Sequence, residues 1–109
     1  MLSWKKENRF SKENNFLYVK SVRIIVTGKV QGVFFRKHAK ENADKLGVKG
    51  FVQNMHNDTV YIEAEANEET LEQFIEWCKQ GSPSSTVEKI IVSELTFTGF
   101  KNFIVRHGD

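Results

Sequence analysis

The chain has 109 residues, which is enough for one domain and too few for two of ordinary size. Hydrophobic residues make up 39% and charged residues 28%, so the composition excludes a disordered chain and favours a regular fold with an apolar core. The net charge is +2, but residues 1–20 carry five Lys or Arg against two acidic residues, and residues 21–109 carry eleven against twelve. This balance excludes a basic domain surface for nucleic acid.

Residues 1–20 are polar, and their aromatic side chains have no regular spacing, so we predict a mobile N-terminal extension before a domain at 21–109. In the alternative, residues 16–19 extend or dock on the sheet of that domain. Residues 1–16 contain no apolar run of signal-peptide length, and no stretch approaches the roughly 20 apolar residues that span a bilayer. We therefore expect a cytoplasmic protein without membrane contact.

Residues 21–28 alternate apolar and polar side chains, which predicts a strand. From Phe34 the spacing becomes that of a helix with one apolar stripe, and Gly47 predicts the end of this helix. Two further strands, at 48–55 and 59–66, are joined by the short segment HND and predict a hairpin.

Asn67 is predicted to cap a second amphipathic helix that ends near Gly81. A loop at 81–85 then leads to a long strand at 87–97 and a short strand at 103–107. The order β-α-β-β-α-β plus a short edge strand predicts an α+β, ferredoxin-like split βαβ fold, with two helices on one face of an antiparallel sheet. This architecture hosts many unrelated activities.

The only cysteine, Cys78, excludes an internal disulfide and a cysteine metal cluster, and its place on the apolar stripe of the second helix indicates packing. His56 and His107 have no partner at metal-ligand spacing, and we interpret His38 as structural. We therefore expect neither a metal nor another cofactor. The glutamates of the third strand and second helix are expected to face solvent: Glu63, Glu65, Glu68, Glu69, Glu72 and Glu76.

The segment GKVQGVFFR, residues 28–36, connects the first strand to the first helix. A helix N-terminus has unpaired backbone N–H groups, and its dipole favours an anion. Gly32 can adopt backbone angles that direct consecutive N–H groups toward one anion, and the guanidinium of Arg36 can add a bidentate pair of hydrogen bonds to the same anion. A phosphate-sized dianion suits this description, and an ordinary turn with a surface arginine is the equally compatible alternative.

The same segment resembles the signature of the acylphosphatase family, G-x-V-Q-G-V-x-F-R, at every defined position from Gly28 to Arg36. The segment GFVQN at 50–54 resembles the second family signature, which ends in asparagine, and it follows at the expected distance. The resemblance covers about residues 21–107. It therefore includes nearly the whole chain outside the extension.

Departures from the family lie outside the two signatures. Glycine is usual in the family at the positions of Asp58 and Ala66, and tyrosine is usual at the position of His107. The extension at 1–20 is also longer than usual. The first two changes concern turn geometry, and their effect is left open by the sequence.

The resemblance implies a metal-independent hydrolase that cleaves an acyl phosphate into a carboxylate and inorganic phosphate. It also implies that inorganic phosphate binds in competition with the substrate. Arg36 and the loop N–H groups would bind the phosphoryl group, and Asn54 would hold the attacking water. We expect the first two strands to be neighbours, which would bring Asn54 to the loop. The phosphate-binding loop implied by the family consists of Val30, Gln31, Gly32, Val33, Phe34 and Phe35.

A non-catalytic anion-sensing or interaction module on the same fold is the second hypothesis, and turnover of benzoyl phosphate separates the two. The segment KGFVQNMH at 49–56 opens like an RNA-recognition motif but lacks its later aromatic residues, so we expect no nucleic-acid ligand. A monomer is expected. The sequence identifies neither the physiological acyl phosphate nor the role of the extension.

Overall fold

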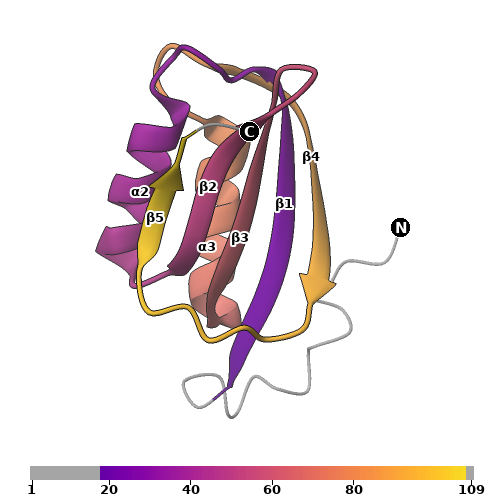
Figure 1. Cartoon of the computed structure of the whole chain (residues 1–109). Coiled ribbons are helices and arrows are strands. Elements are labelled where there is room, and N and C mark those ends of the chain that lie inside the picture. The colour runs from indigo at the N-terminus through magenta and orange to yellow at the C-terminus, as the bar shows by residue number, and fades with distance from the viewer. Residues whose placement is uncertain (1–17, 108–109) are drawn as a thin grey trace.

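A five-stranded sheet with two helices packed on one face makes up the fold (Figure 1). The structure is a computed structural model that describes residues 18–107, so most of the predicted N-terminal extension lies outside the described residues. The predicted ferredoxin-like α+β fold is confirmed. The elements in chain order are β1 (Val19–Lys29), α2 (Phe35–Leu46), β2 (Lys49–Met55), β3 (Thr59–Asn67), α3 (Glu68–Gln80), β4 (Thr86–Leu95) and β5 (Phe103–Arg106).

The strand order is β4-β1-β3-β2-β5, with three antiparallel pairs and one parallel pair. The parallel pair is β2 with β5, because residues 96–102 carry the chain from the end of β4 along one end of the sheet to its far edge (Figure 1). A strand that starts at this end of the sheet is antiparallel in direction to β4, as β2 also is. The antiparallel prediction thus holds for β1 to β4, and the edge strand makes the sheet mixed.

The core lies between the sheet and the two helices. The alternation in β1 turns Val22, Ile24 and Val26 toward the helices, and all three are fully buried. On α2 the ring of Phe35 is 1% exposed and contacts Trp77 of α3, with ring centroids 5.1 Å apart. Because this ring is anchored in the core, the first turn of α2 has a fixed position at the end of the sheet.

The helix boundaries agree with the predicted capping signals. The Asn67 side chain accepts a hydrogen bond of 2.8 Å from the backbone N–H of Thr70, and Gly47 ends α2 with a φ of 83°. The first strand begins at Val19, two residues before the predicted start, where it pairs with Asn67. Within residues 18–107, no helix is long and apolar enough to cross a membrane.

The connection between β4 and β5 differs from the prediction. β4 ends at Leu95, and the carboxylate of Glu65 accepts hydrogen bonds of 2.6–3.1 Å from the backbone N–H groups of residues 98–100. The prediction that Glu65 faces solvent is wrong, since it is 2% exposed beneath this connection. Glu68, at the start of α3, is also buried and was wrongly predicted to be at the surface.

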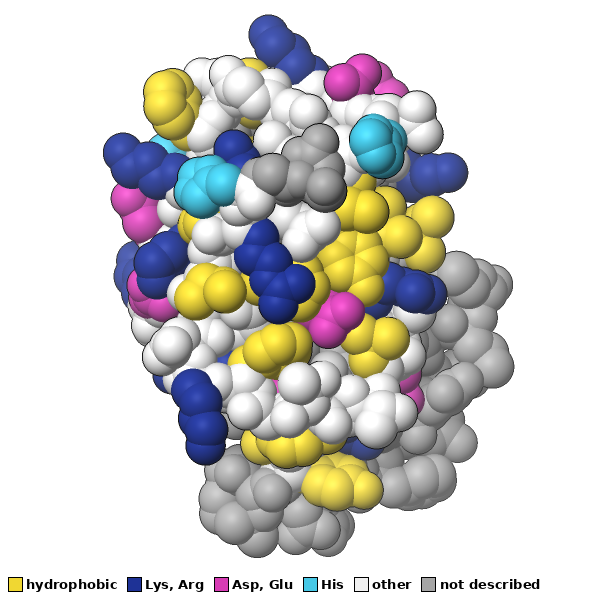
Figure 2. Space-filling model, viewed as in Figure 1, with side chains coloured by type: hydrophobic (Ala, Val, Ile, Leu, Met, Phe, Trp, Pro, Cys, Tyr) yellow, Lys and Arg dark blue, Asp and Glu magenta, His cyan; other side chains and the backbone are white. Residues whose placement is uncertain are grey.

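The sheet face opposite the helices carries aromatic rings that the sequence did not predict there. Figure 2 shows this face, with hydrophobic side chains gathered near its centre among Lys, Arg and acidic side chains. Phe51 stacks on Tyr61 at 5.9 Å, and the guanidinium of Arg106 lies 3.6 Å from the centre of the Phe51 ring. Since Phe51 is only 5% exposed, its ring has no open face on which a nucleic-acid base could stack.

Candidate active site

Three parallel strands, β1, β2 and β5, end at the same end of the sheet, where α2 begins (Figure 1). The expectation that β1 and β2 are neighbours is wrong, because β3 lies between them. Helix α2 brings the loop after β1 close to the end of β2, since the helix follows this loop and packs against β2 and β5. The site is therefore assembled by the helix rather than by strand pairing.

The loop after β1 leaves the sheet at a β-bulge beside Gly28. A Cβ atom at Gly28 would lie 2.2 Å from the carbonyl oxygen of Thr86, so only glycine fits this close approach. Farther along, φ is positive at Gly32 and Phe34 but not at the residues just before each of them. This alternation is the backbone pattern of an anion-binding nest, in which successive N–H groups converge.

The backbone N–H groups of this loop are without an acceptor among the residues that the structure describes. None of the turn and cap hydrogen bonds within residues 18–107 is donated by the backbone N–H groups of residues 31–36. Phe34, which precedes α2, provides no side-chain cap. The predicted loop therefore presents several free donors at the positive end of a helix dipole.

Two side chains from elsewhere hold the loop in this shape. The Gln31 amide nitrogen donates hydrogen bonds of 2.8 Å to the carbonyl oxygens of both Met55 and Thr59, which flank the β2–β3 turn. The buried hydroxyl of Ser82 donates a hydrogen bond of 2.8 Å to the carbonyl oxygen of Val33. Sequence reasoning missed both contacts, since they join residues 24 to 49 positions apart.

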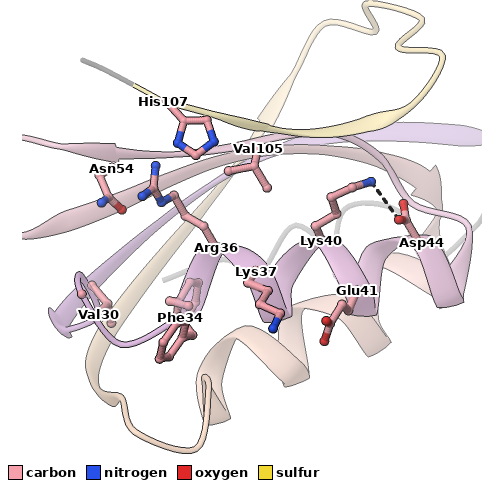
Figure 3. A pocket seen from close by; sticks show the side chains of 12 residues that line it. Val30, Phe34, Arg36, Lys37, Lys40, Glu41, Asp44, Asn54, Val105 and His107 are labelled. Carbon is pink, nitrogen blue, oxygen red and sulfur yellow. Dashed lines mark hydrogen bonds and ion pairs between the residues drawn. The ribbon is translucent and has the colours of Figure 1, made fainter.

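Arg36 lies in the first turn of α2 and points into a cleft of about 600 Å³ (Figure 3). Its Nη1 atom donates a hydrogen bond of 3.0 Å to the carbonyl oxygen of Arg106 at the end of β5. A guanidinium has five N–H donors, so this contact fixes the side chain and leaves other donors for an anion.

Asn54 reaches the same cleft from the end of β2, and Figure 3 shows its side chain directed toward the Arg36 guanidinium. Its Oδ1 atom is buried and accepts no hydrogen bond from any residue that the structure describes. A buried carbonyl oxygen without a donor is unfavourable. This oxygen is therefore suited to accept a hydrogen bond from a molecule that enters the cleft.

Six of the eight predicted site residues line this cleft: Val30, Gly32, Phe34, Phe35, Arg36 and Asn54. Val33 is buried, and the side chain of Gln31 is turned to the β2–β3 turn, so neither of them lines it. The prediction did not include Lys37, Lys40, Glu41, Asp44, Val105 and His107, which also line it.

The charge of the cleft suits an anion. Three cationic side chains, Arg36, Lys37 and Lys40, face two acidic ones, Glu41 and Asp44, which leaves an excess of one positive charge. Within the described part of the chain, no group of three or more His, Cys, Asp or Glu residues is arranged to hold a metal ion.

Comparison with protein families and with curated proteins points to the acylphosphatases. The family model described as Acylphosphatase matches residues 22–105. The acylphosphatase of Ligilactobacillus salivarius is 44% identical over 90 residues, which are 82% of this chain and 100% of that protein. The acylphosphatase of Thermotoga maritima is 38% identical over 89 residues, which are 82% of this chain and 99% of that protein.

The likeness extends to solved structures. The crystal structure of acylphosphatase from Bacillus subtilis superposes with a TM-score of 0.78 at 40% identity, and the match covers 82% of this chain and 99% of that one. An acylphosphatase from Coxiella burnetii gives a TM-score of 0.79 at 30% identity, covering 86% of this chain and 96% of that one. The family model, the relatives and the fold agree that the chain belongs to the acylphosphatase family, the enzymes that hydrolyse acyl phosphates.

Proposed function

We propose that this acylphosphatase uses Arg36 and the N–H groups of residues 30–35 to bind the phosphoryl group, and Asn54 to hold the attacking water. The observation that carries the proposal is the shared cleft: the unpaired Oδ1 of Asn54, the guanidinium of Arg36 and the free loop donors all belong to it. An anion and a polar neutral molecule can thus lie side by side there.

The loop and Arg36 supply the electrostatic part of the reaction. In the transition state of its transfer, a phosphoryl group carries its negative charge on three equatorial oxygens, and fixed hydrogen-bond donors around them stabilise this charge. The loop donors are held by Gln31 and Ser82, and Arg36 is held by the carbonyl of Arg106. Because these groups are already in place, little reorganisation is needed during the reaction.

Asn54 supplies the positioning part. A carboxamide oxygen accepts a hydrogen bond from water and directs its lone pair without removing a proton. As the water oxygen forms its bond to phosphorus, the bond to the acyl oxygen breaks, and the carboxylate leaves with the electron pair. The water proton passes to a phosphoryl oxygen. Since a carboxylate is a good leaving group, no general acid, metal or cofactor is required.

Hydrolysis of benzoyl phosphate in the presence of EDTA tests this mechanism, with inorganic phosphate as competitor. We expect metal-free turnover and competitive inhibition by phosphate. Phosphate binding without turnover would instead favour the anion-sensing module, and loss of turnover in EDTA would contradict the metal-free route.

Three predictions from the sequence complete the proposal. We expect a monomer, a cytoplasmic location and no nucleic-acid ligand. Light scattering of the purified protein tests the first of these, and a dimer would contradict it.

A further inference from the structure

An imidazole lies at the cleft that contains Arg36. His107 follows the last residue of β5, and it lines the cleft together with Arg36 and Asn54. Figure 3 shows its ring beside the Arg36 guanidinium. None of the steps of hydrolysis described for the loop, Arg36 and Asn54 uses this ring.

The backbone places His107 close to the guanidinium. Arg36 Nη1 donates its hydrogen bond of 3.0 Å to the carbonyl oxygen of Arg106, which belongs to the peptide bond between Arg106 and His107. In a trans peptide this oxygen lies about 2.8 Å from the next Cα atom, so the Cα atom of His107 is within roughly 6 Å of Nη1. Charges closer than the Debye length of about 10 Å are not fully screened. A charge on His107 therefore acts on an anion that Arg36 binds.

Within residues 18–107, the charged groups that line the cleft with His107 come from α2. They are Arg36, Lys37, Lys40, Glu41 and Asp44. Asn54, from β2, is neutral, and the guanidinium of Arg106 lies on Phe51 on the other face of the sheet. Of all these side-chain types, only imidazole ordinarily changes its charge between pH 5 and 8. Protonation of His107 would raise the excess of positive charge in the cleft from one to two.

We propose that His107, in its protonated form, is a second cationic group of the phosphoryl site and makes anion binding depend on pH. The proposal rests on the proposed function, because it requires the anion to lie beside Arg36. A protonated imidazole attracts this anion and the neutral ring does not. Binding is therefore tighter where the imidazole is protonated and weaker at higher pH, and the protein takes up protons as the anion binds.

The pH dependence would be a property of chains with histidine at this position. Tyrosine, which is usual there in the family, stays uncharged near neutral pH. A protein with tyrosine would keep the loop and the arginine, and its cleft would have the same charge on both sides of neutrality.

Inorganic sulfate is the probe, because it keeps two negative charges from pH 5.5 to pH 8, whereas phosphate loses a proton in this range. Its Kd is measured by calorimetry at both pH values and at low ionic strength. For the unaltered protein we expect the Kd to be about fivefold lower at pH 5.5, the upper size of an exposed ion pair, since His107 is exposed. Titration at pH 7 in two buffers of different ionisation enthalpy should show net uptake of protons.

Two substitutions of His107 should act in opposite directions. His107→Gln keeps a polar side chain without a charge, so the Kd should equal the weaker value of the unaltered protein at both pH values. His107→Lys keeps a cation at both pH values, so the Kd should stay near the tighter value. A residue that only supports the end of β5 would not give these opposite results, and a Kd that still changes with pH in both variants would overturn the proposal.

The two other histidines of the chain provide matched controls. His56, in the β2–β3 turn, and His38, on α2, do not line the cleft. His56→Gln and His38→Gln should both keep the fivefold change in Kd and the proton uptake. Loss of the pH dependence in either control would assign it to that histidine, and the proposal would be wrong.

The same titrations separate this proposal from the proposed function. If sulfate binds the unaltered protein with the same Kd at both pH values, the role of His107 fails and the proposed function stands. If binding depends on pH through His107 but benzoyl phosphate is not hydrolysed, only the proposed function fails. If sulfate does not bind, or if Arg36→Ala binds it as the unaltered protein does, the anion does not lie beside Arg36 and both proposals fail.

Discussion

At the scale of single residues, Asn54 is expected to separate binding from turnover. Its unpaired Oδ1 atom faces the cleft, whereas the phosphoryl group is assigned to other donors. Asn54→Ala should therefore lower kcat for benzoyl phosphate by about 100- to 1000-fold and leave the inhibition constant of inorganic phosphate nearly unchanged. Gln53→Ala is the control, because it removes a carboxamide from the opposite face of β2. An unaltered rate in Asn54→Ala would contradict the water-holding role.

Arg36 is expected to serve binding and turnover together. Arg36→Ala removes a fixed guanidinium beside the loop, so kcat should decrease by at least about 100-fold and phosphate inhibition should weaken as well. Steady-state kinetics with phosphate as inhibitor measures both. Arg106→Ala is the matched control, since its own guanidinium lies on Phe51 on the other face and only its backbone carbonyl contacts Arg36. Normal phosphate inhibition in Arg36→Ala would contradict the assignment.

Arg36 was predicted from its place in the first turn of a helix, and the resemblance to the two family signatures implied the roles of both Arg36 and Asn54. Gln31 stands in the same signature, yet the contacts of its side chain were not predicted. A backbone role can be inferred from the neighbouring residues alone. A hydrogen bond to carbonyl groups of Met55 and Thr59 depends on where the β2–β3 turn lies in space, which local patterns do not specify.

At the scale of elements, Glu65 is expected to hold the connection that leads to β5. Glu65→Ala removes the acceptor of three partly buried backbone N–H groups, which should lower the free energy of unfolding by about 2 kcal/mol. The melting temperature should then decrease by roughly 8–16 °C. Urea and thermal unfolding measure the change.

Glu63→Ala is the control for this prediction. Glu63 lies two residues earlier in β3, and among the described residues its carboxylate accepts one hydrogen bond of 2.8 Å, from the hydroxyl of Tyr61. Its removal should cost less than about 1 kcal/mol. Equal stability losses in both variants would show that the connection does not depend on Glu65.

Each strand and helix was predicted to within about two residues, because alternation and helical periodicity are local properties. The neighbours in the sheet were harder to predict. The position of β3 between β1 and β2, and the parallel pairing of β5, depend on pairs that are far apart in the sequence. The burial of Glu65 has the same origin, since residues 98–100 cover it only after the sheet is assembled.

At the scale of the whole molecule, phosphate binding is expected to stabilise the folded state. The reactivity of one buried thiol can report this coupling. Cys78 is the only cysteine of the chain and is fully buried, and burial raises the pKa of its thiol. A thiol reagent at pH 8 should therefore react with it only when the protein opens, because the reactive species is an exposed thiolate.

Inorganic phosphate should slow this reaction if it binds only the folded protein. At a phosphate concentration 100 times its Kd, the folded state gains about 2.7 kcal/mol, which corresponds to roughly 100-fold slower labelling when reclosing is fast. Arg36→Ala should label at a rate that phosphate does not change, because the site no longer binds it. The contradicting result would be that phosphate, at a concentration that inhibits turnover, does not slow the labelling of Cys78 in the unaltered protein. The site would then bind phosphate without stabilising the fold around it.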